Sequence, residues 1–384
     1  MLIELHGGNF RNKGALKMLI TTKKMLEAKY PQARFVADAS VGTDEELESL
    51  GIEKLYIRRN WMGSRYFRPK FAIQRLVADF DRKFPNLFKD KLTLNKVDAI
   101  VDIAGFAYTD QWGFKPTQDF SSLSQWYKNN GKKVILLPQA FGSFTSSQIK
   151  QAIEKVIDNA DMINARDASS YDNLNNIKSS HNVYQNSDIT LFENYKTDNR
   201  ATLKHSKVAI IPNMRMLDRG GDFWKSNYIN SLDNIIKVCE ELEVEPIMVI
   251  HDHSGEDKKI HTLINSKIKC QSITDPWELK EYLSNCRFVV GSRFHGLVAA
   301  LSTGVPVLSL GWSHKYKELL NDFNVSKYLI DEKNNSKNEM HDLISELSEI
   351  EKNNEIRRVI MEEFMKKKNK NKQMWEKVFS ILEK

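Results

Sequence analysis

The sequence predicts an α/β protein with two doubly wound, Rossmann-like domains, each built on a parallel sheet. Apolar runs of strand length alternate with segments whose apolar residues follow helical spacing, which favours parallel sheets with crossover helices. The chain has 384 residues, which exceeds the usual size of a single hydrophobic core. A polar stretch from Glu193 to Arg200 separates two such alternating series and is typical of a linker.

The first series gives an N-terminal domain over residues 1–195. After the first strand, apolar residues return every three or four positions from Ala15 through Met18, Leu19 and Thr22 to Leu26, as in an amphipathic helix. The segment from Trp61 to Phe88 is basic, aromatic and poorly periodic, and we interpret it as an insertion that covers this domain. The predicted strands are Leu2–His6, Arg34–Ala37, Ala99–Ile103, Lys133–Leu137 and Met162–Ala165.

The second series gives a C-terminal domain over residues 205–365, which we expect to face the first domain across a cleft. Residues 366–384 are predicted as a helix that places Trp375, Val378, Phe379 and Leu382 on one face and packs back on the body. The other predicted elements are the strands Lys207–Pro212, Pro246–His251, Arg287–Val290 and Val305–Leu310 and the helices Tyr228–Leu242 and Trp277–Ser284.

Composition argues against several classes of protein. No apolar run is long enough to span a bilayer, and the N-terminus lacks the basic start and long apolar core of a signal peptide. The three cysteines, Cys239, Cys270 and Cys286, are far apart and suggest neither a disulfide framework nor a zinc site. We therefore expect a cytoplasmic protein.

The net charge of +7 is modest and would suit an anionic substrate or an anionic membrane face. The lysines are dispersed and no recognition-helix or finger signature occurs, so nucleic acid is not an expected partner. One run, Lys366 to Lys372, is concentrated. A solvated helix face is the favoured interpretation of this run, and the alternative is a peripheral contact with lipid head groups at the inner membrane surface.

A stretch from Gly291 to Leu301 carries the clearest signal for a ligand site. The apolar run before it stops at Gly291, and a turn with Arg293 and His295 then leads into a helix of small residues. Ligands of open α/β sheets bind outside the carboxyl ends of the strands, and a helix start favours an anion. An Arg at this place adds a planar fork suited to phosphate or carboxylate. Either residue alone could be structural, but together they predict a site for a small anion.

Further polar residues follow other predicted strands. In the second domain these are Asn213 with Arg215, and His251, which should converge with Arg293 on one edge of the sheet. His251 and His253 would share a face of an extended chain, but no third ligand is evident, so we expect no metal. The corresponding residues of the first domain are Asn12, Asp102, Asp110, Gln139 and Arg166 with Asp167, of which the last two could simply form a salt bridge. A carboxylate inside an apolar strand, such as Asp102, needs a partner or a catalytic role.

These residues resemble the polysaccharide pyruvyl transferase family over roughly Gly7 to Phe323. The more specific matches are Gly291-Ser292-Arg293-Phe294-His295-Gly296 and Gly311-Trp312-Ser313-His314-Lys315-Tyr316-Lys317-Glu318. Weaker ones are Asn12-Lys13-Gly14-Ala15, Asp102-Ile103-Ala104-Gly105-Phe106, Pro138-Gln139-Ala140-Phe141-Gly142, Ala165-Arg166-Asp167 and Pro212-Asn213-Met214-Arg215. Many relatives carry an Asp where this chain has Ala15.

The resemblance implies a two-domain fold of the GT-B type and transfer of a pyruvyl group from phosphoenolpyruvate onto two hydroxyls of a sugar, as a cyclic ketal. The second domain would hold phosphoenolpyruvate through Arg215, Arg293 and His295, with Asn213, Phe294 and His251 around them. His295 would also supply a proton. The first domain would hold a glycan or lipid-linked acceptor against Asn12 and Gln139, with Asp110 or Asp102 as the base. No redox or nucleotide cofactor is required, and the sequence fixes neither the acceptor sugar nor the oligomeric state.

Two other functions compete with this hypothesis. A sugar-nucleotide glycosyltransferase of the same fold often carries two acids near the helix of the second domain, whereas the first acid after His295 is Glu318. A non-catalytic binding protein of an envelope pathway would predict a degraded anion site, whereas Arg215, Arg293 and His295 are all present. Only Ala15 favours the second alternative.

Overall fold

A computed structural model describes the chain except for residues 56–69, 85–91, 193–205, 253–254 and 312. Strands and helices alternate along it, and the chain divides into two compact units. Unit 1 comprises Met1–Ile189 and Asn371–Lys384, and unit 2 comprises Thr190–Lys370. The predicted linker Glu193–Arg200 lies outside the described residues, as do Trp61–Pro69 and Pro85–Phe88 of the predicted insertion.

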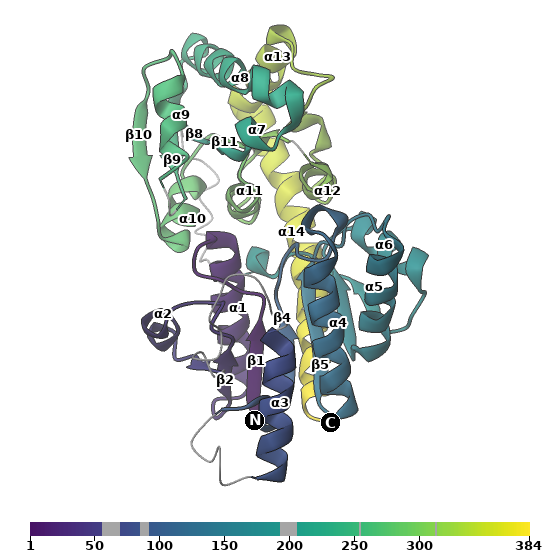
Figure 1. Ribbon diagram of the computed structural model, residues 1–384. Helices are drawn as coiled ribbons and strands as arrows, with labels where there is room; N and C mark the ends of the chain where they lie inside the picture. The colour runs from purple at the N-terminus through teal and green to yellow at the C-terminus, as the bar shows by residue number, and fades with distance from the viewer. Residues whose placement is uncertain (56–69, 85–91, 193–205, 253–254, 312) are drawn as a thin grey trace. The chain divides into compact units, whose positions relative to one another are not determined.

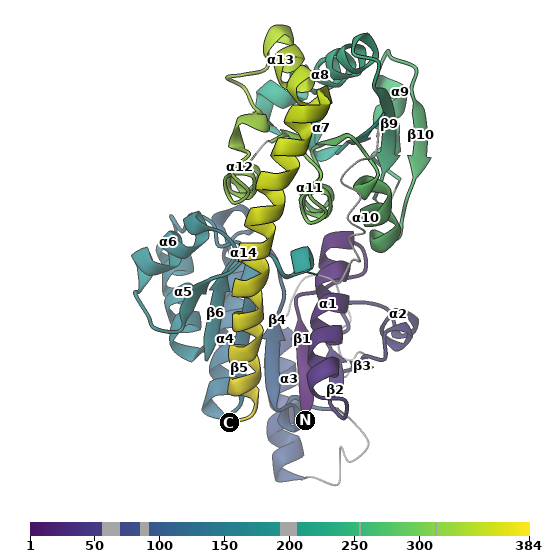
Figure 2. The same cartoon turned by 180° about the vertical axis from the view of Figure 1, so that it is seen from behind.

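Unit 1 is built on a seven-stranded sheet in the order β3-β2-β1-β4-β5-β6-β7, in which all neighbours are parallel. Figures 1 and 2 show α1 and α14 over one face and α3 and α4 over the other. The strands are β1 (Leu2–His6), β2 (Arg34–Ala37), β3 (Glu53–Lys54), β4 (Ala99–Asp102), β5 (Lys133–Gln139), β6 (Met162–Ala165) and β7 (Val183–Gln185). The helices are α1 (Lys13–Lys29), α2 (Asp44–Ser49), α3 (Lys70–Lys83), α4 (Phe114–Asn129), α5 (Ser147–Asn159) and α6 (Ala168–Ile177), with a 3-10 turn at Asp110–Trp112.

Unit 2 is built on a six-stranded sheet in the order β10-β9-β8-β11-β12-β13, again entirely parallel. The strands are β8 (Lys207–Ile211), β9 (Glu245–Ile250), β10 (Lys269–Ser272), β11 (Phe288–Gly291), β12 (Val307–Leu310) and β13 (Leu329–Ile330). The helices are α7 (Arg215–Asp218), α8 (Gly221–Glu241), α9 (Lys258–Leu263), α10 (Pro276–Ser284), α11 (Phe294–Leu301), α12 (His314–Asn321) and α13 (Lys337–Ser348), followed by α14 (Ile350–Leu382).

Both sheets have a topological switch point beside their first strand. The chain winds outward from β1 to β3 in unit 1 and then resumes on the other side of β1 with β4. Unit 2 repeats this with β8 and β11. Ligands of such sheets bind where the strand order reverses, outside the carboxyl ends of the strands. The fold therefore predicts ligand sites at the loops after β1 and β4 and at those after β8 and β11.

The predicted α/β class is confirmed, and the differences lie mainly at element ends. Helix α8 begins at Gly221 rather than at Tyr228, because Trp224 is also buried against the core of unit 2. Helix α14 begins at Ile350, well before residue 366, and its last turns belong to unit 1. There Trp375 and Val378 are buried in the same apolar cluster as β1 and α1. No described helix is long and apolar enough to cross a membrane.

The two faces of the first sheet differ in one important way. Ile3 and Val101 point into the apolar cluster shared with α1 and α14. On the opposite face, among residues that pack against α4, β1 and β4 carry the carboxylates Glu4 and Asp102, which are 2% and 0% exposed. Burying a charge without a partner is costly, so these two groups must be held by specific neighbours.

Candidate functional site

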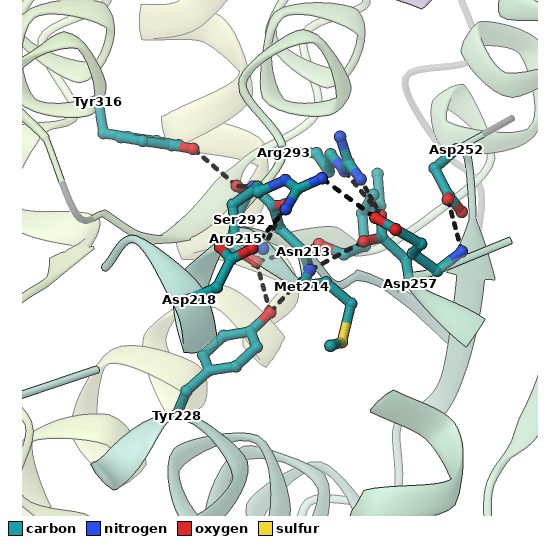
Figure 3. Close-up of polar contacts among 12 residues, drawn as sticks. Asn213, Met214, Arg215, Asp218, Tyr228, Asp252, Asp257, Ser292, Arg293 and Tyr316 are labelled. Carbon is teal, nitrogen blue, oxygen red and sulfur yellow. Dashed lines mark hydrogen bonds and ion pairs between the residues drawn. The ribbon is translucent and has the colours of Figure 1, made fainter. Parts of the chain in front are cut away.

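The loops that follow β8 and β11 are tied together at the switch point of unit 2. The side-chain amide of Asn213 donates to the carbonyl of Ser292 at 2.9 Å, and the Tyr316 hydroxyl donates to the same carbonyl at 2.7 Å. The Tyr228 hydroxyl accepts from the Asn213 backbone N–H at 3.0 Å and lies 2.5 Å from Ser292 Oγ. Figure 3 shows these contacts converging from α8, α12 and the two loops. The loops carrying Arg215 and Arg293 therefore have a fixed relation to each other.

Close packing places α11 directly on the sheet. A Cβ on Gly296 would lie 2.8 Å from Ile211 Cδ1, and a Cβ on Gly291 would lie 2.8 Å from Leu297 Cδ2. A larger residue at either position would therefore require the Ile211 or Leu297 side chain to move. The side chain of Arg293, which directly precedes the first residue of α11, Phe294, makes no capping hydrogen bond to the helix. A helix start next to an arginine favours an anionic ligand.

Both predicted arginines contact acids of one loop, the one that follows β9. Arg293 Nε lies 2.6 Å from Asp257 Oδ2, and its side chain is 32% exposed while that of Asp257 is 1% exposed. Arg215 pairs with Glu256 at 3.1 Å and with its neighbour Asp218, both of which are exposed. Figure 3 shows the two guanidinium groups close together above Asp257. The structure therefore brings Arg215 and Arg293 together at the switch point, each held by acidic partners.

Asp257 organises this site, although sequence analysis did not identify it. Its Oδ1 accepts the backbone N–H of Met214 at 2.8 Å, while its Oδ2 holds Arg293, so one carboxylate connects the loops after β8, β9 and β11. Burial raises the pKa of this carboxyl group, and the charge of Arg293 acts in the opposite direction. Both Nε and Nη2 of Arg293 lie 2.6 Å from Asp257 Oδ2, so this buried ion pair fixes the orientation of the guanidinium group.

The other predicted residues of unit 2 lie at the same edge of the sheet. His295 occupies the first turn of α11, with its ring 5.5 Å from that of Phe294, which is largely buried against Tyr316. Lys315 places its ammonium 5.6 Å from the centre of the Phe294 ring, which adds a cation that the sequence analysis did not single out. His251 is 8% exposed and its Nδ1 lies 2.8 Å from the carbonyl of Ile273, so its ring faces β10.

The metal hypothesis for His251 and His253 cannot be followed through the fold, because His253 lies outside the described residues. Within the part of the chain that is described, no group of three or more His, Cys, Asp or Glu side chains is placed to hold a metal ion.

At the switch point of unit 1, Asp102 lies below the surface rather than at it. Its Oδ2 accepts the Tyr108 hydroxyl at 3.0 Å and the Gln139 side-chain amide at 2.8 Å. Burial raises the pKa of Asp102, and His6 opposes this shift. Asp102 and Gln139 are both 0% exposed. The predicted residues Asp102 and Gln139 are thus brought together, and their contacts position the loops after β4 and β5.

Two charged residues that sequence analysis did not single out complete this cluster. Glu4 receives a hydrogen bond from the Tyr127 hydroxyl of α4 and lies 3.2 Å from Nδ1 of His6. His6 pairs in register with Asp102 across β1 and β4, and its side chain is 28% exposed. Burial alone would lower the pKa of His6, but the hydrogen bond to Glu4 and the nearby charge of Asp102 raise it to about 9. The sequence signal for this cluster is the presence of Glu4 and His6 within the otherwise apolar strand Leu2–His6.

The remaining predicted residues of unit 1 have structural partners. Asn12 caps α1, where its side-chain oxygen accepts the backbone N–H of Gly14 at 2.9 Å and that of Ala15 at 3.4 Å. Asp110 accepts the backbone N–H and the hydroxyl of Thr145, at 2.7 and 3.0 Å, and so fixes the loop before α5.

The Arg166–Asp167 salt bridge considered from the sequence is not the contact that forms. Arg166 pairs with the buried Asp188 at 3.3 Å, and both side chains are less than 10% exposed. Asp167 instead caps α6 by accepting the backbone N–H of Ser170 at 2.7 Å. Adjacent residues at a strand end point in different directions, so the side chains of Arg166 and Asp167 contact different residues.

With this geometry in place, the comparisons with known proteins identify the family. The sequence profile described as polysaccharide pyruvyl transferase matches residues 12–314, which is most of the chain. The protein therefore belongs to the polysaccharide pyruvyl transferase family. No curated protein matches the chain in sequence.

Solved structures show that the fold is that of GT-B glycosyltransferases and epimerases. Apo UGT2 of Phytolacca americana aligns with a TM-score of 0.58 at 11% identity, covering 100% of both chains. The calicheamicin glycosyltransferase CalG4 gives 0.56 at 9% identity, covering 100% of this chain and 98% of its own. UDP-GlcNAc 2-epimerase of Methanocaldococcus jannaschii gives 0.55 at 12% identity, covering 90% and 92%. At such low identity these proteins are similar in fold alone.

The charge cluster in unit 1 predicts a specific pH dependence of stability. The pKa of His6 is about 9 in the folded chain and about 6.5 when unperturbed. This histidine therefore stabilises the fold fully below pH 6.5, and the contribution is lost as pH rises through 9. Over this range it should amount to roughly 1–3 kcal/mol in the free energy of unfolding.

Urea unfolding followed by circular dichroism at pH 6 and pH 9.5 measures this effect. We expect His6→Gln to flatten the decline that the unchanged protein shows, whereas His181→Gln, which alters an exposed histidine of the same unit, should leave it intact. Equal pH dependence in the His6 variant and the unchanged protein would contradict the assignment.

Proposed function

We propose that this protein transfers a pyruvyl group from phosphoenolpyruvate to two hydroxyls of a sugar in a cell-surface polysaccharide or its precursor, and forms a cyclic ketal. The observation that carries the proposal is the pair Arg215 and Arg293, held by acids of one loop at the switch point of unit 2. Phosphoenolpyruvate carries a phosphate and a carboxylate on a three-carbon frame, so two adjacent guanidinium groups match its two anionic ends.

The two arginines would contribute differently to binding. Arg293 rests on the buried Asp257, so its guanidinium is already oriented and little conformational entropy is lost when the donor binds. Arg215 contacts two exposed carboxylates, Asp218 and Glu256, which can turn toward water when a dianionic ligand replaces them. Exposed ion pairs of this kind are worth little, so their exchange costs little. Lys315 and the start of α11 would add further positive potential.

His295 would supply the proton that starts the reaction. Protonation of the methylene carbon turns it into a methyl group and leaves the adjacent carbon electron-poor, and the first sugar hydroxyl adds there as it loses its proton. The second hydroxyl then forms its bond to the same carbon, the bond from this carbon to the phosphate oxygen breaks, and phosphate leaves with the proton of that hydroxyl. An imidazole changes protonation near neutral pH, which suits this first step. Phosphoenolpyruvate supplies the three-carbon unit and His295 the proton of its new methyl group, so the proposal includes no further cofactor.

We assign the acceptor to unit 1, where directional hydrogen bonds are available. Asp110 is only partly buried, and it remains our candidate for the base that takes the hydroxyl proton. Asp102 is fully buried under Tyr108 and Gln139, so we assign it a positioning role.

A groove along the outer face of unit 1 supports an acceptor there. It lies between α4 and α5, has a volume of about 540 Å³, and begins at Phe114, close after Asp110 in the chain. Amide side chains that can both donate and accept hydrogen bonds line it, and such groups suit neutral sugar hydroxyls. These are Gln118, Gln125, Gln148 and Gln151.

The donor site predicts a large loss of affinity when its fixed arginine is removed. Arg293→Ala should weaken phosphoenolpyruvate binding by roughly 2 kcal/mol or more, at least about thirtyfold in Kd, because a desolvated charge contact is lost. Isothermal titration calorimetry measures the Kd for phosphoenolpyruvate in each variant. Arg34→Ala removes the same charge from an exposed ion pair of unit 1 and should bind normally.

The substitution at residue 293 also leaves Asp257 without its partner, which could destabilise the fold. A second variant therefore separates lost binding from lost stability. The double variant Arg293→Ala/Asp257→Asn removes both charges and should keep the melting temperature closer to that of the unchanged protein while it still binds phosphoenolpyruvate poorly. Normal affinity in the folded double variant would refute the donor site.

The proton donor can be separated from a simple phosphate ligand by its kinetics. His295→Gln keeps a hydrogen-bonding side chain but lacks a titratable proton, so kcat should fall by about 10²–10⁴-fold with little change in the KM for phosphoenolpyruvate. The limb of the pH–rate profile due to His295 should disappear as well. A rise in KM with unchanged kcat would show that His295 only binds the donor.

A further inference from the structure

Helix α3 exposes two large apolar residues, Leu76 and Phe80, while Ala78 and Asp81 face the body of unit 1. Ala78 is 0% exposed and Asp81 is 3% exposed, and Asp81 Oδ2 accepts the Thr93 hydroxyl at 2.6 Å. In contrast, Leu76, Phe80 and, directly after the helix, Phe84 are 59%, 53% and 54% exposed. This is the reverse of the usual arrangement, in which the apolar face of a helix packs on the core.

The three exposed side chains form one continuous stripe. They are spaced four residues apart, which places them on one side of a helix, and the rings of Phe80 and Phe84 are 6.1 Å apart. The other large apolar side chains that are exposed among the described residues are single and scattered: Met1, Met25, Trp112, Leu263, Ile350 and Met365. A contiguous apolar surface rimmed by charges is typical of a docking site, whereas isolated exposed residues are ordinary.

The charge of α3 and of the sequence that leads into it identifies the kind of surface that the stripe fits. The sequence from Arg58 to Lys83 contains eight Arg and Lys residues and two Asp, a net charge of +6, while the whole chain carries +7. Arg82 and Lys83 are both exposed, between Phe80 and Phe84. Two copies of so basic a segment would repel each other, so a second copy of this chain is a poor occupant. An anionic lipid surface satisfies both the apolar stripe and the cations.

We propose that α3 docks this protein onto an anionic membrane surface. Leu76, Phe80 and Phe84 would enter the boundary between head groups and acyl chains, and Arg82 and Lys83 would contact lipid phosphates. Stable peripheral binding usually takes two signals, and an apolar stripe with a polybasic segment provides them. Arg82 also donates to Asn130 at 2.6 Å, which places the end of α3 near the amino-terminal edge of the first sheet, opposite the edge with Asp102.

This inference deepens the proposed function, because a pyruvyl transferase held at the membrane would meet acceptors that are linked to lipid. It also assigns the membrane contact to a different element from the Lys366–Lys372 run. In that run Lys366 pairs with Glu363 and Lys367 pairs with Asp322, and the run includes no stripe of large apolar side chains. Arg82 also forms an ion pair, with Asp79 at 3.7 Å, so it is the apolar stripe that distinguishes α3 from this run.

Co-sedimentation of the full chain with vesicles tests the proposal. The unchanged protein should bind vesicles of phosphatidylcholine with phosphatidylglycerol, and should bind phosphatidylcholine alone much less. Leu76→Ser/Phe80→Ser/Phe84→Ser should lower the partition coefficient at least about tenfold, because burial of each side chain in an apolar medium is favourable. The matched variant Leu263→Ser/Ile350→Ser/Met365→Ser changes three similarly exposed residues elsewhere and should bind like the unchanged protein.

Three results would overturn the proposal. These are failure of the unchanged protein to bind the anionic vesicles, equal loss of binding in both triple variants, and a dimer in solution that the α3 variant abolishes while vesicle binding persists. The outcome is independent of the proposed function, because the α3 variant should still transfer pyruvate to a water-soluble glycan at the normal rate. Loss of that activity in the unchanged protein, with membrane binding intact, would instead refute the proposed reaction.

Discussion

The buried carboxylate of Asp257 is the constraint on which the candidate donor site depends. It holds the backbone of the loop after β8 at Met214 and the guanidinium of Arg293 after β11, while it belongs to the loop after β9. A charge this deeply buried requires its partners. If the three loops separated, the Asp257 carboxylate would lose these partners or become exposed to water. The carboxylate thereby joins three strand ends into one rigid site with a fixed cation. Arg215, whose acid partners are exposed, remains free to adapt to a ligand.

The two switch points share a topology but use charge in opposite ways. In unit 2 the cations face outward from a buried acid, as an anion-binding site requires. In unit 1 the acids Glu4 and Asp102 are enclosed by tyrosines, a glutamine and His6, and the charge serves to hold the loops. This division agrees with an anionic donor in one unit and a neutral, hydrogen-bonding acceptor in the other.

Sequence reasoning recovered the central strands because they are buried on both faces and read as continuous apolar runs. It missed the edge strands β3, β7, β10 and β13, which pair on one side only. The first three carry polar residues, and β13 has only two residues. Arg215 and Arg293 were predicted because polar residues after buried strands meet at one sheet edge. Asp257 was not, because it lies in a stretch rich in Asp and Lys that looks like any exposed loop. Burial, which distinguishes it, is a property of the fold and not of the local pattern.

The most direct test of the central claim is the chemistry of the product. A cell-surface polysaccharide from the source organism, treated with mild acid to remove existing ketals, would be incubated with phosphoenolpyruvate and the unchanged protein. Mass spectrometry of its oligosaccharides should show, for each modified sugar, a gain equal to the mass of pyruvic acid less that of water, with one phosphate released for each ketal formed. A gain of a whole sugar residue from a nucleotide sugar, with no transfer from phosphoenolpyruvate, would contradict the account.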